Sequence, residues 1–252
     1  NTYTYVSWNW KAGTSFSNDA SGTGIGTIDS TGSANTDAGF SIVSWTGTQT
    51  AGTIKHGLST PPRLIIVKAR TQDDGWYSWH IDYDASNNKY QRLEIAGGLG
   101  AGTAFWNDTA PTSSVFSVGN STGTNHSSAM IAYCFADVPN YQKIGKYIGN
   151  GNANGSYIHL GFKASFVFFK RIDTGKDGII HDNKRYPSNQ PVAKILKPNT
   201  DTQDADTGNI DIFSNGFKLL STGSNSNANG GTYIYYAIAE NPFVTSTGIP
   251  TT

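Results

Sequence analysis

The sequence predicts an all-β protein built from two tandem β-sandwich modules. Short runs of β-branched and aromatic residues, bounded by Gly, Asn, Pro or Thr, recur along the chain, and long apolar stripes with the period of a helix are absent. The composition agrees, because 29 Gly, 13 Tyr, 12 Phe and 6 Trp accompany only 14% charged residues, a mixture that suits short strands and tight turns. An internal repeat is the third observation, and it divides the chain into modules.

The predicted strands fall into two series. The first series comprises residues 2–10, 40–46, 63–70, 76–81, 90–95, 115–118 and 129–136. The second series comprises residues 142–148, 165–172, 178–182, 210–213, 216–220 and 232–239. In the second series, Asn215-Gly216 predicts a β-hairpin with a type I′ turn between Phe213 and Phe217, because Asn and Gly tolerate positive φ.

The two series repeat with a nearly constant offset. LIIVK at 64–68 matches FVFFK at 166–170, 102 residues later, and SAMIAYCFADVPN at 128–140 matches GTYIYYAIAENPF at 231–243, 103 residues later. Generic strand patterns align at any even offset, so a shared offset indicates a tandem duplication of a module of about 100 residues, the usual size of a β-sandwich. We therefore predict one sandwich over residues 39–139 and a second over residues 140–252, which ends in a C-terminal tail.

Residues 1–38 lie outside this repeat. NTYTYVSWNWKAG at 1–13 has the same polar lead-in and aromatic run as the repeated strand, so it predicts the last strand of a preceding module in a longer chain. Residues 14–38 are small and polar and predict a linker or long surface loop. A donated strand that completes the first sandwich is the alternative.

Charge and hydropathy exclude several partners and chemistries. Eighteen basic and eighteen acidic side chains give a net charge of zero, so we expect no nucleic acid partner. No apolar run approaches the roughly 18 residues of a membrane span, so we expect no membrane insertion.

Cys134, the only cysteine, lies in the apolar run MIAYCFA, which predicts a buried structural thiol and not a nucleophile. The H-E-x-x-H motif and the P-loop are absent, and no G-x-S-x-G nucleophile elbow between a strand and a long helix is predicted, so we predict no enzyme, no catalytic residues and no cofactor.

Two histidines lie beside acidic residues. His80 precedes Asp82, and Asp182 follows His181. Imidazole with carboxylate suits a catalytic pair or a metal site, whereas the alternative is that both histidines end equivalent strands and face solvent. Strand alternation places His80 and Asp82 on one face but His181 and Asp182 on opposite faces, so the repeat preserves the histidine and not the pair. The acidic run 201–211 lacks the spacing of a calcium loop, and we therefore predict no metal site.

Aromatic residues offer a different type of site. Tyr77 and Trp79 of GWYSWH share one face of a strand, and Trp76 shares the other face with His80. Planar rings beside Asp, Asn and His stack on sugars in lectin-like sites, but they also pack cores and subunit interfaces. The candidate binding residues are therefore Trp76, Trp79, His80, Asp82, His181 and Asp182, with core or interface packing as the alternative.

Several segments resemble a known family. YVSWNWKAG, GFSIVSWTG, IKHGLSTPPRLIIVKAR, WNDTAPTSSVFSVG, SNGFKLLSTG and YYAIAENPFVTSTGIPTT are similar to repeated β-modules of virion-associated, tail fibre-like or appendage-like proteins of marine tailed bacteriophages, including cyanophages. The resemblance covers residues 5–252 and implies a place on the virion surface, as a tail fibre, a receptor-binding appendage or a head decoration. It assigns no activity and no site residues.

These observations favour a phage virion structural protein, most simply a tail fibre or other surface appendage that contributes to attachment to host-surface glycans. Its expected partners are further copies of itself in a homo-oligomer, other virion proteins and a host glycan. A head decoration or a structural β-module without ligand is the alternative. A carbohydrate-active enzyme is a third interpretation, which normally needs two carboxylates that converge in a sugar-sized groove.

Overall fold

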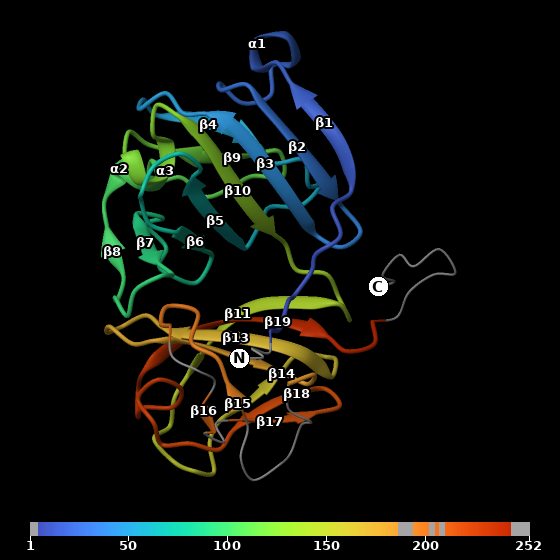
Figure 1. Ribbon diagram of the computed structural model, residues 1–252, viewed down its shortest axis with the longest axis vertical. Helices are drawn as coiled ribbons and strands as arrows, with labels where there is room; N and C mark the ends of the chain where they lie inside the picture. Colours follow the sequence, from blue (N-terminus) through green and yellow to red (C-terminus); the bar gives the residue numbers. More distant parts are fainter. Residues whose placement is uncertain (1–4, 186–193, 202–204, 207–209, 243–252) are drawn as a thin grey trace.

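The protein is all-β, as predicted, and its strands form two modules that are stacked one above the other in Figure 1. The computed structural model describes residues 5–185, 194–201, 205–206 and 210–242 of the chain. Three one-turn helices, α1 (Ala20–Thr23), α2 (Thr103–Trp106) and α3 (Thr122–Asn125), lie in the connections of the first module. None of the helices in the described residues is long and apolar enough to cross a membrane.

The first module contains ten strands in two antiparallel sheets. They are β1 (Thr14–Asn18), β2 (Ser30–Asn35), β3 (Phe40–Thr46), β4 (Gly52–Lys55), β5 (Leu64–Ala69), β6 (Tyr77–His80), β7 (Lys89–Arg92), β8 (Gly100–Ala101), β9 (Val115–Val118) and β10 (Ala129–Phe135). The large sheet has the order β1-β2-β3-β10-β5-β6-β7-β8, and β4 pairs with β9 in the small sheet.

The second module repeats the central part of this arrangement. Its strands are β11 (Gln142–Ile148), β12 (Tyr157–His159), β13 (Ala164–Arg171), β14 (Gly178–Asp182), β15 (Lys194–Ile195), β16 (Ala205–Asp206), β17 (Ile210–Phe213), β18 (Gly216–Leu219) and β19 (Thr232–Ala239). The order β11-β19-β13-β14 corresponds to β3-β10-β5-β6, and the sheet β12-β18-β17 faces it. The duplication inferred from the sequence is therefore present in the strand order.

The prediction that residues 14–38 form a linker is wrong. Strand β2 pairs with β3 along its whole length, from Ser30 opposite Trp45 to Asn35 opposite Phe40, and β1 pairs with β2. The residues are small and polar because this hairpin lies at the edge of the sheet, where most of its side chains are partly or fully exposed. The alternative, in which added strands complete the first sandwich, describes this segment better.

The predicted hairpin at 210–220 is present, but its turn differs from the prediction. Phe213 pairs with Gly216, so Ser214 and Asn215 form the turn and Gly216 is already part of β18. A Cβ atom at Gly216 would lie 2.2 Å from the carbonyl oxygen of Ile158 on the neighbouring strand β12. The glycine is therefore required by close packing against β12 and not by a type I′ turn.

Each module encloses its own apolar core. Trp79, Trp106 and Phe116 are fully buried in the first core, and Phe169 and Phe217 are fully buried in the second. Cys134 is also buried in the first core, and burial raises the pKa of its thiol to about 12. The prediction of a structural thiol is confirmed, because a thiol with such a pKa stays protonated at neutral pH.

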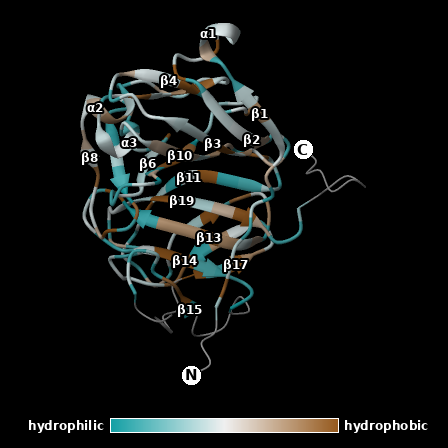
Figure 2. Cartoon of the chain, turned by 45° about the horizontal axis from the view of Figure 1, so that its top comes forward, coloured by the Kyte–Doolittle hydropathy of each residue, from teal (hydrophilic) through white to brown (hydrophobic). Residues whose placement is uncertain are grey.

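The modules also share a buried aromatic interface. The outward faces of the two large sheets pack against each other, with Phe40, Leu64 and Phe135 on one side and Phe166 and Tyr236 on the other. The rings of Phe135 and Tyr236 lie 5.0 Å apart between centroids. Figure 2 shows hydrophobic residues on β11 and β13, which lie at the middle of the molecule. Both faces of the large sheets are thus buried. This explains why their central strands carry apolar side chains on both faces and not on one face only.

An N-terminal strap, residues 5–13, enters this interface from the lower end of β1 (Figure 1). It forms no strand, so the prediction of a terminal strand of a preceding module is wrong for these residues. Its alternation is real, however, because Val6, Trp8 and Trp10 are half-buried while the residues between them are exposed. The Trp10 Nε1–H donates a hydrogen bond to the Tyr236 hydroxyl over 2.9 Å. The strap is therefore an extended segment held by its side chains.

A buried asparagine fixes the same loop in both modules. Asn125 accepts a hydrogen bond from Thr48 N and donates to Thr50 O and Gly119 O. Asn227, 102 residues later, accepts from Asn150 N at 2.9 Å and donates to Asn152 O at 2.9 Å and Ser221 O at 2.8 Å. These partners are displaced by the same 102 residues.

We predict that Asn227→Ala destabilises the second module by about 2–4 kcal/mol, because it leaves buried backbone groups without hydrogen-bond partners. Chemical denaturation of the full chain measures the loss. Asn229→Ala, which removes an exposed amide two residues away, is the control and is expected to change the free energy of unfolding by less than about 0.5 kcal/mol. Equal losses in the two variants would contradict the assignment.

Candidate functional site

A cleft of about 510 Å³ opens beside the interface between the modules. We call it the intermodule cleft. Its lining residues are Trp8, Asn9, Trp10, Phe40, Ile42, Ile66, Trp76, Leu93, Glu94, Tyr133, Phe135 and Pro198. Three segments that are far apart in the sequence therefore meet at one place, namely the strap, the first large sheet and the second module.

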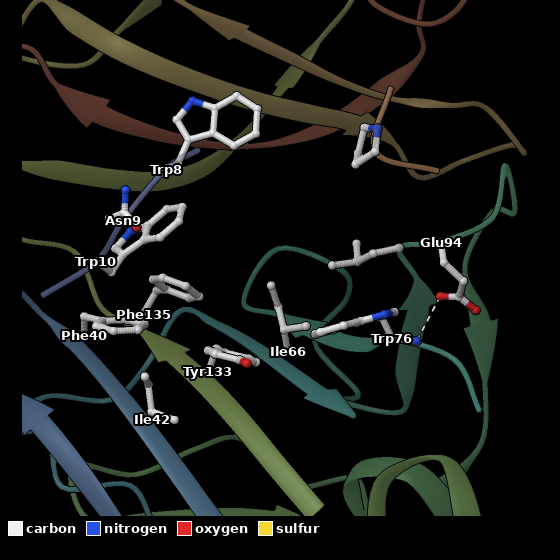
Figure 3. Close-up of a pocket in the computed structure, with 12 residues that line it drawn as sticks. Trp8, Asn9, Trp10, Phe40, Ile42, Ile66, Trp76, Glu94, Tyr133 and Phe135 are labelled. Atoms are coloured by element: carbon white, nitrogen blue, oxygen red, sulfur yellow. Dashed lines mark hydrogen bonds between the residues drawn. The ribbon is translucent and has the colours of Figure 1, made fainter. Parts of the chain in front are cut away.

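The first large sheet forms the floor of the intermodule cleft (Figure 3). Ile42, Ile66 and Tyr133 come from β3, β5 and β10, and all three point outward from the core of the first module. Trp8 and Trp10 lie at one end of the cleft, and Trp76 and Glu94 lie at the other (Figure 3). The cleft is thus a short apolar channel between two aromatic ends.

Trp76 is the candidate binding residue that the structure places in this cleft. Its side chain is 38% exposed, and its ring stacks on that of Tyr133 with centroids 6.3 Å apart and an interplanar angle of 29°. The backbone N–H of Trp76 donates to Glu94 Oε2 over 2.9 Å, which fixes the start of β6. Part of the Trp76 ring is therefore held in place while it remains accessible to a ligand.

Glu94 is the acidic group at the same end of the cleft. Its Oε1 atom lies 2.6 Å from both Nε and one terminal nitrogen of Arg92, and its Oε2 accepts from Trp76. The guanidinium of Arg92 also lies over the Tyr77 ring. The carboxylate is thus paired and oriented, so it positions Trp76 and carries little free negative charge.

Trp79 cannot contact a ligand, contrary to the candidate assignment. Its side chain is 2% exposed and belongs to the first core, where Trp79 pairs with Ile65 across β5 and β6. The predicted alternation is correct, because Trp76 and His80 lie on the opposite face from Tyr77 and Trp79. The alternative of core packing applies to Trp79.

The prediction that His80 and His181 face solvent is wrong. Both side chains are buried, and both lie in the interior of the molecule. The two histidines also do not occupy equivalent positions in the repeat, contrary to the prediction. His181 pairs with Val167, and the equivalent pair in the first module is Trp79 with Ile65. The position equivalent to His80 is Asp182. The two histidines therefore share neither a position in the repeat nor a site.

Burial lowers the pKa of both histidines to about 3, and the nearby positive charges of Arg63 and Arg185 act in the same direction on His80 and His181 respectively. His80 Nδ1 accepts a hydrogen bond from the backbone N–H of Asp82 over 3.0 Å. Both imidazoles are consequently neutral at physiological pH. His80 is packed and hydrogen-bonded, whereas the His181 ring packs against Phe169.

The two candidate carboxylates make structural ion pairs. Asp82 lies 3.7 Å from Arg63 and 3.7 Å from Lys146 of the second module. Asp182 is buried and accepts hydrogen bonds from the side chain and backbone of Arg185. Among the described residues, no group of three or more His, Cys, Asp or Glu side chains is arranged to hold a metal ion. The acidic run 201–211 lies partly outside these residues.

Tyr133, Glu94 and Trp10 are cleft residues that the sequence interpretation missed. A signal for Tyr133 was present, since the repeat places Tyr236 at the equivalent position and both tyrosines face the other module. An aromatic residue kept on the outward face in both copies indicates a second packing surface. Nothing in the sequence placed Glu94 next to Trp76, since that contact depends on the pairing of β6 with β7.

Comparison with known proteins assigns the chain to a family. Residues 1–242 match the model of a family described as a domain of unknown function, DUF7483. The chain belongs to the DUF7483 family. No curated protein and no solved structure matches it significantly. Because the DUF7483 match spans the strap and both modules, the intermodule cleft lies within a single family unit.

We predict that stability falls as the pH is lowered from about 7 to 5, because His80 and His181 take up protons in the unfolded state near pH 6.5 but not in the folded state until about pH 3. The contribution of these neutral histidines to the free energy of unfolding is fully present above the pKa of histidine in the unfolded chain. It is lost progressively as the pH falls below that value. Each histidine contributes on the order of 2 kcal/mol of loss at pH 5.

His80→Gln is expected to reduce this loss by about 2 kcal/mol, as measured by denaturant unfolding at the two pH values. His159→Gln replaces an exposed histidine and serves as the control. This variant is expected to lose as much stability between pH 7 and pH 5 as the wild type does. A His80→Gln variant as acid-sensitive as the wild type would contradict the burial argument.

Proposed function

We propose that this chain is a structural protein of a phage virion, in a tail fibre or another surface appendage, and that it contributes to attachment by binding a host-surface glycan in the intermodule cleft. The similarity of its segments to virion-associated modules supports the phage setting. A neutral, disulfide-free pair of sandwiches fused through a buried interface suits a rigid appendage.

The half-exposed Trp76 ring stacked on Tyr133 is the observation that carries the binding proposal. An indole face accepts the apolar face of a sugar ring, and burial of that surface supplies the free energy of binding. Because stacking on Tyr133 already orients the Trp76 ring, less side-chain entropy is lost when a ligand binds. Pre-organised aromatic residues are a common feature of binding surfaces.

The cleft favours binding over hydrolysis. Glu94 is the one carboxylate among its lining residues, and Arg92 neutralises it. Glycoside hydrolysis normally requires two carboxylates on opposite sides of the scissile bond, and a paired glutamate is poorly suited to the role of proton donor. A head decoration or a structural module without ligand is the second candidate, since Trp76 and Tyr133 also suit an interface with another virion protein.

Other exposed apolar residues support the proposal of self-association. Tyr157 and Phe213 are 45% and 40% exposed and contact each other edge to face on the outer surface of the sheet β12-β18-β17. Ile148 is 52% exposed. Aromatic residues of this kind are enriched where subunits meet, so we propose that copies of the chain assemble through the second module.

We predict that antibodies against this chain label the tail fibres or other surface appendages of intact virions in immunogold electron microscopy. Labelling restricted to the head shell would favour the decoration alternative. Labelling that appears only after the capsid is opened would exclude a role in attachment.

We predict that a glycan array probed with the full chain shows binding that Trp76→Ala weakens about tenfold, because loss of the stacking surface removes about 1.4 kcal/mol. Ile81→Ala, which truncates an equally exposed apolar side chain outside the cleft and outside the proposed self-association surface, is the matched control and should bind as the wild type does. Equal binding by wild type and Trp76→Ala would exclude this cleft as the glycan site.

A further inference from the structure

We propose that the intermodule cleft takes a glycan chain of at least two sugar units laid along it, with a second contact on the strap, at Trp8 and Asn9, in addition to Trp76. This inference rests on the proposed glycan-binding function and specifies its ligand class, a chain and not a single terminal sugar. The cleft volume of about 510 Å³ lies in the range of about 300–1,000 Å³ that is typical of sites for drug-sized ligands.

A row of aromatic side chains runs along the cleft from one end to the other (Figure 3). In order along the row they are Trp76, Tyr133, Phe135 and Trp10. The ring centroids are 6.3 Å apart for Trp76 and Tyr133 and 6.1 Å apart for Phe135 and Trp10. Tyr133 and Phe135 are alternate residues of β10 on one face of the sheet, so their Cα atoms are about 7 Å apart. A single pyranose ring on Trp76 covers only the first of these intervals, and the row has room for further sugar units toward the strap.

Polar groups that can meet sugar hydroxyls lie at both ends of this row and on the floor between them. At one end are the Trp76 Nε1–H and the part-exposed carboxylate of Glu94. At the other end Asn9 is exposed, and its Oδ1 accepts no hydrogen bond from the described residues, while its Nδ2 donates only to Ser7. The Tyr133 hydroxyl lies on the floor between the two ends (Figure 3). Sugar units at either end therefore find both an aromatic face and hydrogen-bonding partners.

The strap end of the cleft is oriented before a ligand arrives. The half-buried Trp8 ring lies edge to face on Phe166 with centroids 5.6 Å apart, and the Arg185 guanidinium lies 5.7 Å from its centroid. Trp10 is fixed by its hydrogen bond to the Tyr236 hydroxyl. A glycan that reaches the strap therefore gains apolar contact with side chains that are already held in place, which lowers the entropic cost of binding.

Sugar series of increasing length test the proposal on the full chain by NMR titration. The series are glucose with cellobiose and cellotriose, glucose with maltose and maltotriose, and N-acetylglucosamine with chitobiose and chitotriose. On the glycan array, monosaccharides are compared with longer glycans that end in the same sugar, which extends the test to other linkages. We expect the chain to bind at least about tenfold more tightly than its monosaccharide in at least one series or array set, the factor that burial of roughly 55 Å² of additional apolar surface supplies.

Variants at the two ends of the cleft locate the extra affinity. Asn9→Ala removes an exposed amide and should weaken binding of the chain about threefold, the factor of one lost hydrogen bond, with no effect on the monosaccharide. Trp8→Ala should weaken the chain more strongly and again spare the monosaccharide, whereas Trp76→Ala should weaken both. Lys11→Ala removes an exposed strap side chain outside the cleft and is the control, with both affinities unchanged. Circular dichroism checks that each variant is folded.

The outcomes separate this inference from the proposed function. If sugars bind in a Trp76-dependent way but chains bind no more tightly than monosaccharides, the ligand class is overturned and the glycan site stands. A preference for chains that survives both Asn9→Ala and Trp8→Ala also overturns the inference, because the strap then provides no second contact. If neither the sugar series nor the array glycans bind, or if binding ignores Trp76→Ala, both the inference and the proposed function are overturned.

Discussion

The interface between the two large sheets is the constraint on which the rest of the molecule depends. At its centre Trp10 donates to the Tyr236 hydroxyl, which donates to Gln142 Oε1 over 2.9 Å, and Gln142 Nε2 donates to the carbonyl oxygens of Gly39 and Ala136. This buried chain joins the strap, the second module and the first module. Since each polar group is satisfied by a group from another segment, removal of any one leaves the others unpaired in a low-dielectric environment.

Gene duplication explains why such an interface exists. Both modules present the equivalent face of the equivalent sheet, with Tyr133 and Tyr236 at matching positions, so the pair resembles an isologous dimer joined by Val138 to Gln142. The strap breaks this symmetry, because its two tryptophans occupy one side of the interface. The intermodule cleft lies between the strap and the outward face of the first large sheet, and Pro198 of the second module completes its lining. The strap that the second module holds through Tyr236 and Phe166 therefore forms one end of the site.

The sequence predicted most of the regular structure. Strands such as β3, β11 and β19 match the predicted ranges, because central strands have apolar, β-branched patterns between clear breakers. The edge hairpin β1–β2 was missed because its small polar residues are typical of loops, and Trp8 and Trp10 were misassigned because alternation does not distinguish a paired strand from an extended strap. The histidines were misaligned because a one-residue shift in register reverses the face of every side chain, and only the pairing with β5 and β13 fixes it. The cleft could not be predicted, since Trp8, Trp76 and Pro198 meet through tertiary contacts alone.

The composition of the cleft would link the proposed ligand binding to the cohesion of the two modules. The strap makes few hydrogen bonds to the rest of the chain in the described residues, and Trp8 is held by its contacts with Phe166 and the guanidinium of Arg185. A ligand that contacts Trp8, Tyr133 and Pro198 together would bind only when the strap and both modules are packed as in this structure, so it would stabilise that packing by mass action. A single small apolar site of this kind supports weak affinity. In the multi-copy appendage that we propose, effective concentration would convert such weak sites into firm attachment.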